Sequence, residues 1–504
     1  MTFAELVEPL KLVEEHGNLG VEVSRLTDDS RFVKQGSVFV AVKGGRVDGH
    51  AFIGNAITAG ASALVVQDRG APELGAIAAS GRAVPTVRVE DSRRALGLLA
   101  SRLSHEPSSR LSLVGVTGTN GKTTVTYLCK AILEAGGRRV GIIGTVGYQI
   151  GSEWLAASYT TPGAVELQAL LARMVDAGLD TAIMEVSSHA LALDRTVGCE
   201  FDLAVYTNLT QDHLDFHADM EDYFQAKMRL FTGLTMAGKK SRPKRAIVNA
   251  DDARGHHVCG ATPVPVWTYS IQKQSDIRAE DISLSLAGTR FTAVTPVGKF
   301  PVEAKLVGEH NVYNILAAIG VGLQEGLSPD AIRGGIEAVE NVSGRFERVH
   351  AGQNFTVVVD YAHTEDALVR LLTTAQSLKT GRVITVFGCG GDRDRGKRPR
   401  MGRVAARLSD VVFLTSDNPR TEDPMTIMRQ AEVGIHEAMD PSRVRYEMIA
   451  DRRLAIEAAI GEAKAGDMVL IAGKGHEDYQ IIGTNRVHFD DREVAWAAIQ
   501  KLVH

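Results

Sequence analysis

Residues 111–124 read LSLVGVTGTNGKTT, an apolar run that leads into a glycine-rich loop ending in a lysine and two threonines. The run predicts a buried strand, and residues 125–133 predict a helix after the loop. Such a loop offers backbone N–H groups, a lysine for the β- and γ-phosphates and a hydroxyl for Mg²⁺. The loop departs from the strict P-loop pattern, because Val116 and not glycine stands five positions before Gly121. We predict a nucleoside triphosphate site, with a plain structural turn as the alternative.

The length and composition of the chain indicate several folded domains. The chain has 504 residues, of which 44% are apolar and 23% charged. This balance is typical of folded α/β proteins, and the length exceeds what one compact core supports. We divide the chain into domains at residues 1–107, 108–340 and 341–504, with a polar, proline-containing linker at 105–110.

Short apolar runs predict the strands of all three domains. Most runs end at a polar or glycine-rich motif, and such motifs meet at one edge of an open parallel sheet. We predict an α/β fold with a P-loop ATPase-like parallel sheet in the central domain and a Rossmann-like C-terminal domain that faces it across a cleft. The expected strands are 37–43, 61–66 and 84–89, then 111–116, 140–143, 181–186, 203–206 and 246–248, and finally 357–360, 383–387, 411–414 and 468–472.

Several features of the chain argue against partners other than small molecules. The net charge of −5 argues against broad nucleic-acid binding. The N-terminal stretch lacks the features of a secretory signal, and the uncharged stretch 51–67 is too polar to span a bilayer. The four cysteines are scattered without a CxxC pair, and residues 256–259 (HHVC) are expected to form a loop rather than a metal site. We expect a cytoplasmic monomer without membrane insertion.

Polar residues of the central region are candidates for metal binding. Glu185 ends a predicted buried strand, where a carboxylate needs a cation such as Mg²⁺ or, alternatively, hydrogen bonds from backbone amides. His213, Asp215 and His217 alternate, so a transition metal is conceivable, although a Mg²⁺ ligand from His213 is better supported beside a nucleotide loop. The other two residues are expected to bond the turn. Composition alone predicts that Lys227 is a solvated helical lysine.

A basic loop at 391–400, GDRDRGKRPR, carries five basic residues in ten. Arginine forks are suited to carboxylates and phosphates, so the loop is a candidate anion site. A solvated loop is the alternative.

Taken together, the motifs of this chain resemble the Mur ligase family. They are GTNGKTT, MEVSSH, TNLTQDHLDFH, the helix around Lys227, GEHNVYN, SGRFE, DYAHT, GCGGDRDRGKRP, DNPR and GKGHEDYQ, and the likeness runs from Asp29 to Gln480. The resemblance implies an N-terminal UDP-sugar-binding domain, a central ATP-binding domain and a C-terminal domain for the incoming amino acid.

The resemblance also implies roles in nucleotide and metal binding. It assigns Mg²⁺ to Thr123, Glu185, His213 and Lys227, the last carboxylated to a carbamate by CO₂. The catalytic residues it implies are Lys122, Glu185, His213, Lys227 and Arg345. ATP would contact Gly118, Thr119, Asn120, Gly121, Lys122, Thr123, Thr124, Asn311, Asn314, Arg345 and Asp360.

Two further residue sets are implied for the other substrates. A UDP-muramoyl dipeptide would contact Ser30, Thr160, Thr161, Ser187 and Arg195. The amino acid would contact Arg393, Asp417, Asn418, Pro419, Arg420, Gly473 and Glu477. Family members that take meso-diaminopimelate carry the DNPR sequence, because its arginine pairs with the second carboxylate, which lysine lacks.

The implied activity is ATP-dependent ligation of meso-diaminopimelate to the D-glutamate γ-carboxylate of UDP-N-acetylmuramoyl-L-alanyl-D-glutamate, through an acyl phosphate. This step belongs to cytoplasmic peptidoglycan precursor synthesis, and hence to cell wall biogenesis, cell shape and cell division. The alternatives are a lysine-adding relative, folylpolyglutamate synthase and a P-loop ATPase without synthetic chemistry.

Overall fold

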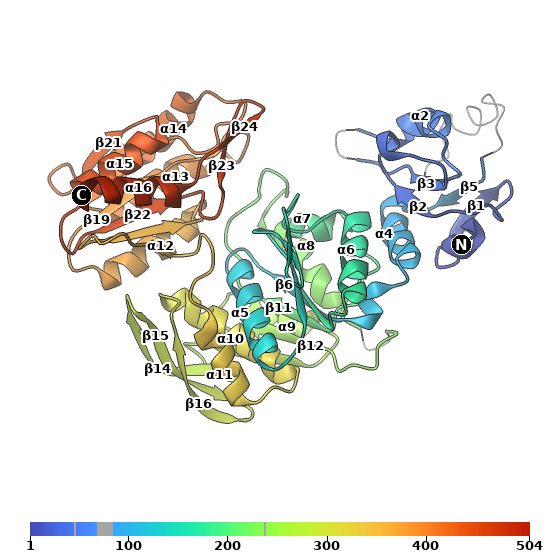
Figure 1. The fold of residues 1–504 in the computed structure, drawn as a ribbon, viewed down its shortest axis with the longest axis horizontal. Helices are drawn as coiled ribbons and strands as arrows, with labels where there is room; N and C mark the ends of the chain where they lie inside the picture. The colour runs from blue at the N-terminus through green and yellow to red at the C-terminus, as the bar shows by residue number, and fades with distance from the viewer. Residues whose placement is uncertain (45–46, 68–83, 236–237, 504) are drawn as a thin grey trace.

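The structure is a computed structural model that describes residues 1–44, 47–67, 84–235 and 238–503. Three sheets, each packed with helices, form three domains (Figure 1). The predicted three-domain α/β fold is therefore confirmed. No helix within the described ranges is both long and apolar enough to cross a bilayer.

The N-terminal domain is built on a five-stranded sheet in the order β1-β5-β4-β3-β2, in which only β1 is antiparallel to its neighbour. The predicted strands at 37–43, 61–66 and 84–89 correspond to β3, β4 and β5, whereas β1 and β2 were not predicted. Residues 107–110 of the predicted linker form a short 3₁₀ helix. The elements are α1 (Phe3–Val7), β1 (Leu12–His16), β2 (Arg25–Thr27), η1 (Ser30–Phe32), β3 (Ser37–Val40), η2 (Gly49–Phe52), α2 (Ile53–Thr58), β4 (Ala63–Val66), β5 (Thr86–Val89), α4 (Ser92–Leu103) and η3 (Pro107–Arg110).

The central domain has an eleven-stranded sheet in the order β16-β15-β14-β13-β12-β11-β6-β10-β7-β8-β9. Its middle, from β7 to β14, is parallel, as predicted. Antiparallel strands that were not predicted, β8–β9 and β15–β16, extend the sheet at its two edges. Strands β15 and β16 alternate buried and more exposed residues and lack the continuous apolar runs used to predict strands.

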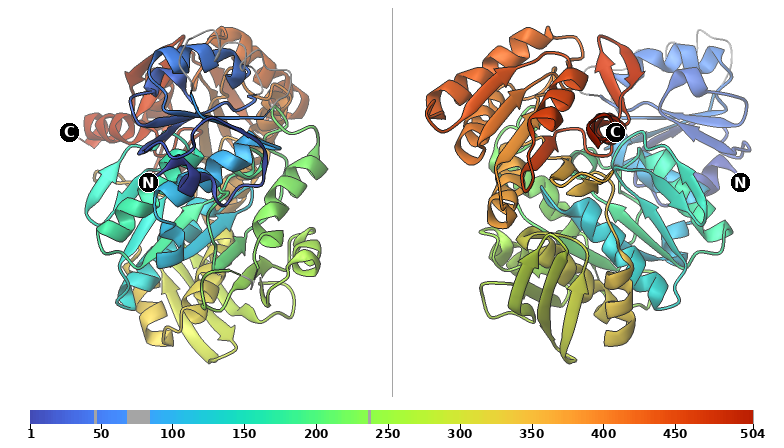
Figure 2. Two further views of the ribbon diagram at one scale, coloured as in Figure 1. Left: turned by 90° about the vertical axis from the view of Figure 1, so that its right-hand side faces the viewer. Right: turned by 60° about the vertical axis from the view of Figure 1, so that its left-hand side comes forward.

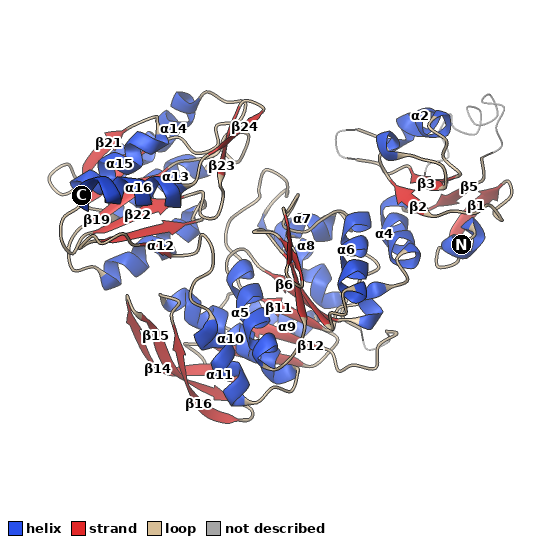
Figure 3. Ribbon diagram, viewed as in Figure 1, coloured by secondary structure: helices blue, strands red, loops and turns tan. Residues whose placement is uncertain are grey.

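Helices cover both faces of the central sheet (Figure 3). One face packs against α5, α10 and α11, and the other against α6, α8 and α9. The stretch 256–259, expected to be a loop, lies within helix α9. The strands are β6 (Ser112–Thr117), β7 (Val140–Ile143), β8 (Tyr148–Ile150), β9 (Glu153–Leu155), β10 (Thr181–Glu185), β11 (Leu203–Tyr206), β12 (Arg245–Asn249), β13 (Val266–Ser270), β14 (Ile277–Ser285), β15 (Gly288–Thr295) and β16 (Gly298–Ala304). The helices are α5 (Lys122–Ala135), α6 (Ala164–Asp176), α7 (Ser188–Ala192), α8 (Met220–Thr232), α9 (Gly255–Ala261), α10 (Glu309–Gln324) and α11 (Pro329–Ala338).

The C-terminal domain has a six-stranded sheet in the order β17-β18-β22-β19-β20-β21, parallel except for β17. Helices α12, α13 and α14 cover one face, and α15 and α16 the other, which gives the doubly wound arrangement expected of a Rossmann-like domain. The elements are β17 (Glu347–Val349), β18 (Thr356–Asp360), α12 (Glu365–Leu378), β19 (Val383–Phe387), α13 (Lys397–Leu408), β20 (Val411–Leu414), α14 (Pro424–Ala438), β21 (Arg445–Met448), α15 (Arg452–Glu462), β22 (Met468–Ala472), the hairpin β23 (Tyr479–Ile482) and β24 (Asn485–His488), and α16 (Asp491–Val503).

The central domain lies between the other two domains. In Figure 1 the N-terminal domain (blue) and the C-terminal domain (red) lie on opposite sides of it, and the right-hand view of Figure 2 again shows the blue domain at the right and the orange-red domain at the left. Helix α4 leaves the N-terminal sheet and packs against α6 of the central domain. Residues at the carboxyl ends of β6, β10, β11 and β12 line one cavity together with residues of the C-terminal domain.

Candidate functional site

The glycine-rich loop between β6 and α5 has a backbone that only glycine adopts easily. Gly118 and Gly121 have φ angles of 143° and 90°. A Cβ on Gly118 would lie 1.9 Å from Thr207 Oγ1, and one on Gly121 would lie 2.4 Å from Asn314 Oδ1. The N–H groups of this loop lie directly before the first turn of α5, where the helix dipole favours an anion.

Two lysine side chains converge on one carbonyl of this loop. Lys122 Nζ donates to Gly118 O at 3.0 Å and to Thr119 O at 2.8 Å. Lys227 Nζ, from α8, donates to the same Gly118 O at 2.9 Å. Lys227 is only 2% exposed, so its predicted solvation was wrong. Burial, and next the Lys122 ammonium, hold the pKa of Lys227 well below its usual value.

The Glu185 carboxylate lies at the end of β10, 1% exposed, beside the same loop. It accepts hydrogen bonds from Thr123 Oγ1 at 3.0 and 3.1 Å, from Thr145 N at 2.8 Å and from Thr145 Oγ1 at 3.1 Å. Within the described chain it forms no ion pair with a lysine, arginine or histidine. A buried carboxylate with only neutral donors is a good ligand for a bound cation.

The histidines of the segment after β11 have different environments. His217 is bonded on both ring nitrogens, at 3.0 Å to Ser188 Oγ and 3.2 Å to Asp222 Oδ2. His213 has a φ of 56°, and its ring contacts the His189 ring at a centroid distance of 4.7 Å. Burial lowers the pKa of His213, which favours the neutral imidazole. Among the described residues, no three His, Cys, Asp or Glu side chains gather as a metal-binding group.

A cavity of about 420 Å³ collects most of the predicted nucleotide-site residues. Asn311 does not line it but supports Asn314, whose Nδ2 donates to Asn311 Oδ1 at 2.9 Å. The predicted residues that line the cavity are Thr119, Asn120, Gly121, Lys122, Thr124, Thr160, Glu185, Ser187, His213, Lys227, Asn314, Arg345 and Asp360.

Other residues that line this cavity were not predicted from the sequence. The motifs GTVG and NADD follow predicted strands, and this position was the signal that could have identified Thr145, Asn249 and Asp251. No pattern pointed to the helical side chains. The missed residues include Thr145, Thr207, Asn208, Asp212, Asn249, Asp251, Asp252, Tyr269, His310, Tyr313, His363 and Arg370.

Side chains of the C-terminal domain contact the glycine-rich loop directly. Arg345 Nη2 donates to Thr123 Oγ1 at 3.1 Å. Asn120 Nδ2 donates to Asp366 Oδ2 at 2.7 Å, and Arg370 Nε donates to the same oxygen at 2.8 Å. The C-terminal domain thus closes one side of the cavity.

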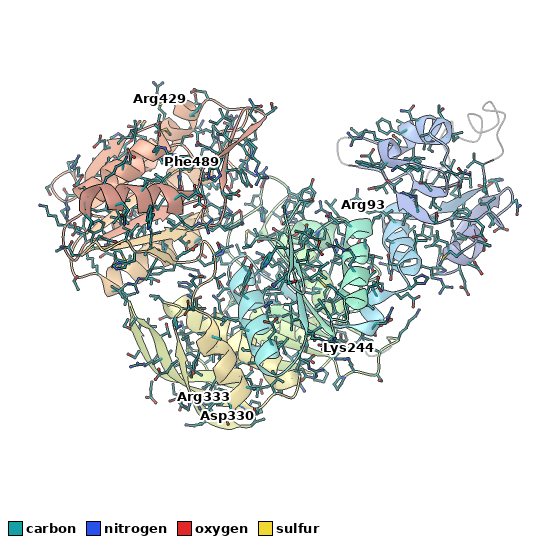
Figure 4. All side chains as sticks on the ribbon, in the orientation of Figure 1. Arg93, Lys244, Asp330, Arg333, Arg429 and Phe489 are labelled. Atoms are coloured by element: carbon teal, nitrogen blue, oxygen red, sulfur yellow. The ribbon has the colours of Figure 1, made fainter. Side chains whose placement is uncertain are left out.

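A second cavity, of about 740 Å³, lies between the N-terminal and central domains. Ser30 and Arg195 line it, and so does Arg93, which Figure 4 labels between these two domains. Tyr159 lines this cavity, whereas its neighbour Thr160 lines the first one. The residues predicted for the sugar substrate therefore extend from the N-terminal domain to the glycine-rich loop.

Thr161 connects this set to the strand that carries Glu185. Its hydroxyl donates to Glu185 O at 2.8 Å and accepts from Ser187 N at 3.0 Å. Arg195 Nη1 donates to Thr161 O at 3.0 Å and its guanidinium lies 4.8 Å from the centre of the Tyr159 ring. Thr161 is buried, and its hydrogen bonds orient Ser187 and Arg195 relative to the end of β10.

Most residues predicted for the amino acid converge after β20 and β22. Asn418 Nδ2 donates to Glu477 Oε2 at 2.8 Å, and Asp417 lies against Gly473, where a Cβ would be 2.8 Å from Asp417 Oδ2. Burial, and next the Asp417 carboxylate, raise the pKa of Glu477. The sequence analysis missed Lys474, which lies at 0% exposure between these acids.

The two predicted arginines border this acidic group. Arg420 Nη1 donates to Gly391 O at 2.7 Å, and Arg393 Nη1 donates to the carbonyl of its neighbour Asp392 at 3.3 Å. Within the described residues, neither guanidinium forms an ion pair with a carboxylate. Arg420 has a φ of 52°, and its backbone is bonded to β23 through Ile481 O at 3.1 Å. Both guanidinium groups can therefore bind an anion without breaking an ion pair.

Three family models match the chain in order. They are described as "Mur ligase family, catalytic domain" at residues 22–103, "Mur ligase middle domain" at 116–322 and "Mur ligase, glutamate ligase domain" at 344–475. Together they match more than half of the chain.

Similar proteins span the full length of the chain. A protein from Geobacter metallireducens, named UDP-N-acetylmuramoyl-L-alanyl-D-glutamate--2,6-diaminopimelate ligase, is 44% identical over 514 residues, with 100% of this chain and 99% of the relative covered. A protein of the same name from Gloeobacter violaceus is 48% identical over 484 residues, with 95% and 94% covered.

Solved structures share the fold. One, titled as the structure of a UDP-N-acetylmuramoyl-L-alanyl-D-glutamate--2,6-diaminopimelate ligase, is 34% identical with a TM-score of 0.70, covering 100% of this chain and 99% of the other. A Mycobacterium tuberculosis folylpolyglutamate synthase is 19% identical with a TM-score of 0.59, covering 80% and 93%, and shows the fold alone. From the three matched domains and the full-length relatives, the chain belongs to the Mur ligase family.

Proposed function

We propose that this chain joins meso-diaminopimelate to the D-glutamate γ-carboxylate of UDP-N-acetylmuramoyl-L-alanyl-D-glutamate, with ATP as co-substrate. The observation that carries the proposal is the pair of guanidinium groups without ion pairs, Arg393 and Arg420, which lie around Gly390 together with the carbonyl of Asn418, whose side chain bonds Glu477. An acceptor with two ammonium and two carboxylate groups matches this combination of charges. The names of the full-length relatives agree with it.

We propose that each domain binds one substrate. Residues 1–107 would hold the UDP-sugar with Ser30, together with Thr160, Thr161, Ser187 and Arg195 of the central domain. Residues 108–340 would hold ATP, and residues 341–504 would hold the amino acid. The second cavity supports the first assignment, because it lies between the N-terminal and central domains.

Lys122 and the loop N–H groups would bind the β- and γ-phosphates of ATP. Arg345 lies 3.1 Å from Thr123 Oγ1 and adds a guanidinium from the C-terminal domain. Asp360, bonded to Phe346 N at 2.7 Å and Ala362 N at 2.8 Å, orders the segment that carries Arg345. The remaining loop residues and Asn311 with Asn314 shape the nucleotide pocket.

The donor set fits Mg²⁺. Thr123 Oγ1 and the buried, ion-pair-free Glu185 carboxylate offer hard oxygen ligands beside the loop, and the neutral His213 ring offers a nitrogen. When bound there, Mg²⁺ would neutralise phosphate oxygens.

Lys227 fits a carbamate. Its amine is buried, its lowered pKa favours the neutral nucleophilic form, and it has no acidic partner in the described chain. The amine nitrogen would form a bond to the carbon of CO₂ and lose one proton, which leaves a carbamate anion. The change would convert a basic amine beside the phosphate loop into an anionic oxygen ligand for a second Mg²⁺.

The residues bind and orient the reactants rather than react with them. The γ-carboxylate of D-glutamate would attack the γ-phosphorus of ATP, releasing ADP and forming an acyl phosphate. The diaminopimelate amine would then attack the acyl carbon, phosphate would leave, and the nitrogen would lose a proton. Lys122 and Arg345 would stabilise charge on the transferred phosphoryl group, and the C-terminal domain would exclude water from the acyl phosphate.

The setting of the reaction follows from its substrates. We place it in the cytoplasm, in peptidoglycan precursor synthesis, with consequences for cell shape and division. We also propose that the chain acts as a monomer, because each of the three substrates has a binding domain within one chain.

Product mass and phosphate release test the proposal. The assay contains ATP, Mg²⁺ and UDP-N-acetylmuramoyl-L-alanyl-D-glutamate, with meso-diaminopimelate or L-lysine as acceptor. Product with diaminopimelate alone is expected. Product with lysine alone would overturn the role of Arg420, a polyglutamylated folate product would indicate a folylpolyglutamate synthase, and phosphate release without any product would indicate a plain ATPase.

A further inference from the structure

Lys474 is a buried cation that has no assigned role in the proposed reaction. It follows β22, is 0% exposed and lies beneath the acidic residues of the amino-acid site. Its Nζ is 3.0 Å from Glu477 Oε2, 3.3 Å from Asn418 Oδ1 and 3.9 Å from Asp417 Oδ1. A lysine is almost never fully buried unless it is paired, so these contacts account for its position.

Lys474 determines which way the Asn418 amide points. Asn418 Oδ1 accepts from Lys474 Nζ and also from Ile481 N at 2.9 Å. With its oxygen side occupied by two donors, the amide directs Nδ2 towards Glu477 Oε2, 2.8 Å away. A flipped amide would place NH₂ against an ammonium and a backbone N–H, leaving three donors without an acceptor.

Lys474 balances only one of the two negative charges of Asp417 and Glu477. Two carboxylates, Asp417 and Glu477, face one ammonium at short range, and Asp417 Oδ1 is buried without a hydrogen-bond partner. The next cation, Arg452, is paired with Asp491 at 2.7 Å. An unpartnered, buried carboxylate oxygen in an anionic group indicates a place for a donor of positive charge.

We propose that Lys474 is a positioning residue that holds Asn418 and Glu477 so that this group binds one ammonium group of the amino-acid substrate. The inference rests on the proposed function, because it deepens the site assigned there to diaminopimelate. Lys474 acts through its neighbours and not on the reacting atoms, since it does not line the nucleotide cavity.

Two properties of the site support this role. Without the Lys474 ammonium, the pKa of Glu477, which burial and Asp417 already raise, would rise further and the carboxylate would tend to be neutral. A neutral acid binds an ammonium group weakly. Gly473, with a φ of 121°, allows Asp417 to lie this close to the chain, because a Cβ at that position would fall 2.8 Å from Asp417 Oδ2.

The test compares Lys474→Met, Lys474→Arg and a control, Lys244→Met. Lys244 is equally buried and paired with Glu200 at 2.9 Å, and Figure 4 labels it in the central domain, well away from the C-terminal domain. We expect Lys474→Met to raise the KM for meso-diaminopimelate by about 100-fold, as expected when a buried ion pair loses one partner. The KM for ATP should stay unchanged, and Lys474→Arg should recover most of the affinity.

A double-mutant cycle keeps the test decisive if Lys474→Met folds poorly. Lys474→Met in a Glu477→Gln background removes both charges together and restores the electrostatic balance. If Lys474 acts through Glu477, the second substitution should add less than about threefold to the KM of Glu477→Gln. Fully additive losses in the cycle would overturn the inference.

The remaining outcomes separate this inference from the proposed function. An unchanged KM for diaminopimelate in Lys474→Met, or a profile equal to that of Lys244→Met, overturns the positioning role. If the wild-type chain itself ligates no diaminopimelate, the proposed function fails instead, and calorimetric titration of the chain with meso-diaminopimelate then shows whether the group binds the amino acid at all.

Discussion

The glycine-rich loop and the site around Lys474 have contrasting arrangements of lysines and carboxylates. At the loop, two lysine side chains, Lys122 and Lys227, share one carbonyl oxygen of Gly118. At the other site, two carboxylates, Asp417 and Glu477, share one ammonium. The first region therefore places two basic side chains on one acceptor, and the second places two acids around one buried lysine.

The difference matches the ligands proposed for the two sites, because phosphate groups would face the loop lysines and one ammonium group of the amino acid would face the acids. A balanced buried pair also occurs in the C-terminal domain, where Arg452 pairs with Asp491 at 2.7 Å. Such balanced pairs stabilise the fold and leave no charge for a ligand. Substitutions at the two sites should therefore change binding, and those at the balanced pairs should change stability.

The largest effect is expected at the glycine-rich loop. Lys122→Ala should lower ATP turnover by at least about 10²–10³-fold, because it removes a cation that would face the phosphoryl group in the transition state. Steady-state phosphate release measures this. Turnover close to wild type would remove the loop from the mechanism and with it the comparison.

Lys227→Met should separate activity from stability. The substitution removes a buried amine whose charged form is costly, so the thermal midpoint should stay the same or rise. Product formation should nevertheless fall by about 100-fold, because an electrostatic group of the site is lost. Differential scanning calorimetry and the product assay check the two halves, and a variant with normal product formation would exclude Lys227 from the catalytic set.

Arg420→Ala should weaken the amino-acid site alone. A lost charge-assisted bond predicts a rise in the KM for diaminopimelate of about 10–100-fold. The affinity for ATP should not change, because the substitution leaves the loop intact. Equal losses for both substrates would contradict the assignment, and titration calorimetry with each substrate distinguishes the two results.

The smallest effect on substrate binding is expected in Glu422→Gln, at a carboxylate that contacts the buried Arg398 and the exposed Arg395. The hydrogen bonds from Arg398 contribute most, and with the Asp392 N–H and the Arg395 charge they lower the pKa of Glu422 from 4.5 to about 2. Because the folded-state pKa is depressed, the stabilisation is complete above about pH 4.5 and is lost as the pH falls towards 2. At pH 7 the variant should lose about 2 kcal/mol of unfolding free energy.

Urea denaturation at several pH values follows this difference. The difference in unfolding free energy between wild type and Glu422→Gln should become steadily smaller below pH 4.5. The KM values at pH 7 should change little. A difference in unfolding free energy that is independent of pH would show that the pKa of Glu422 does not change on unfolding.

The parallel framework of the fold could be predicted from the sequence. Apolar runs such as 383–387 and 411–414 coincide with β19 and β20, because strands buried on both faces need continuous apolar residues. The antiparallel edge strands β14–β16 alternate in burial and were missed. Length and apolar content alone do not distinguish such strands from exposed loops.

The site was predictable where a motif follows a strand end. Lys122 and Glu185 could be placed in this way, but Lys227 could not, since helical periodicity does not tell a buried lysine from a solvated one. Lys474 was quoted within a motif and still missed, because its role depends on two carboxylates brought together by β20 and β22. Such a pairing exists only in three dimensions.

The hydrogen bond that Asn120 donates to Asp366 and the one that Arg345 donates to Thr123 have a thermodynamic consequence. Both contacts join the C-terminal domain to the loop that would hold the phosphates. A nucleotide that prefers one loop geometry would therefore also favour one docking position of the C-terminal domain. The effect of nucleotide binding on domain docking and the effect of domain docking on nucleotide binding then have the same coupling free energy. Weakening the Asp366 contact should therefore change nucleotide affinity by the same factor by which nucleotide changes domain docking, which makes domain position a reporter of nucleotide occupancy.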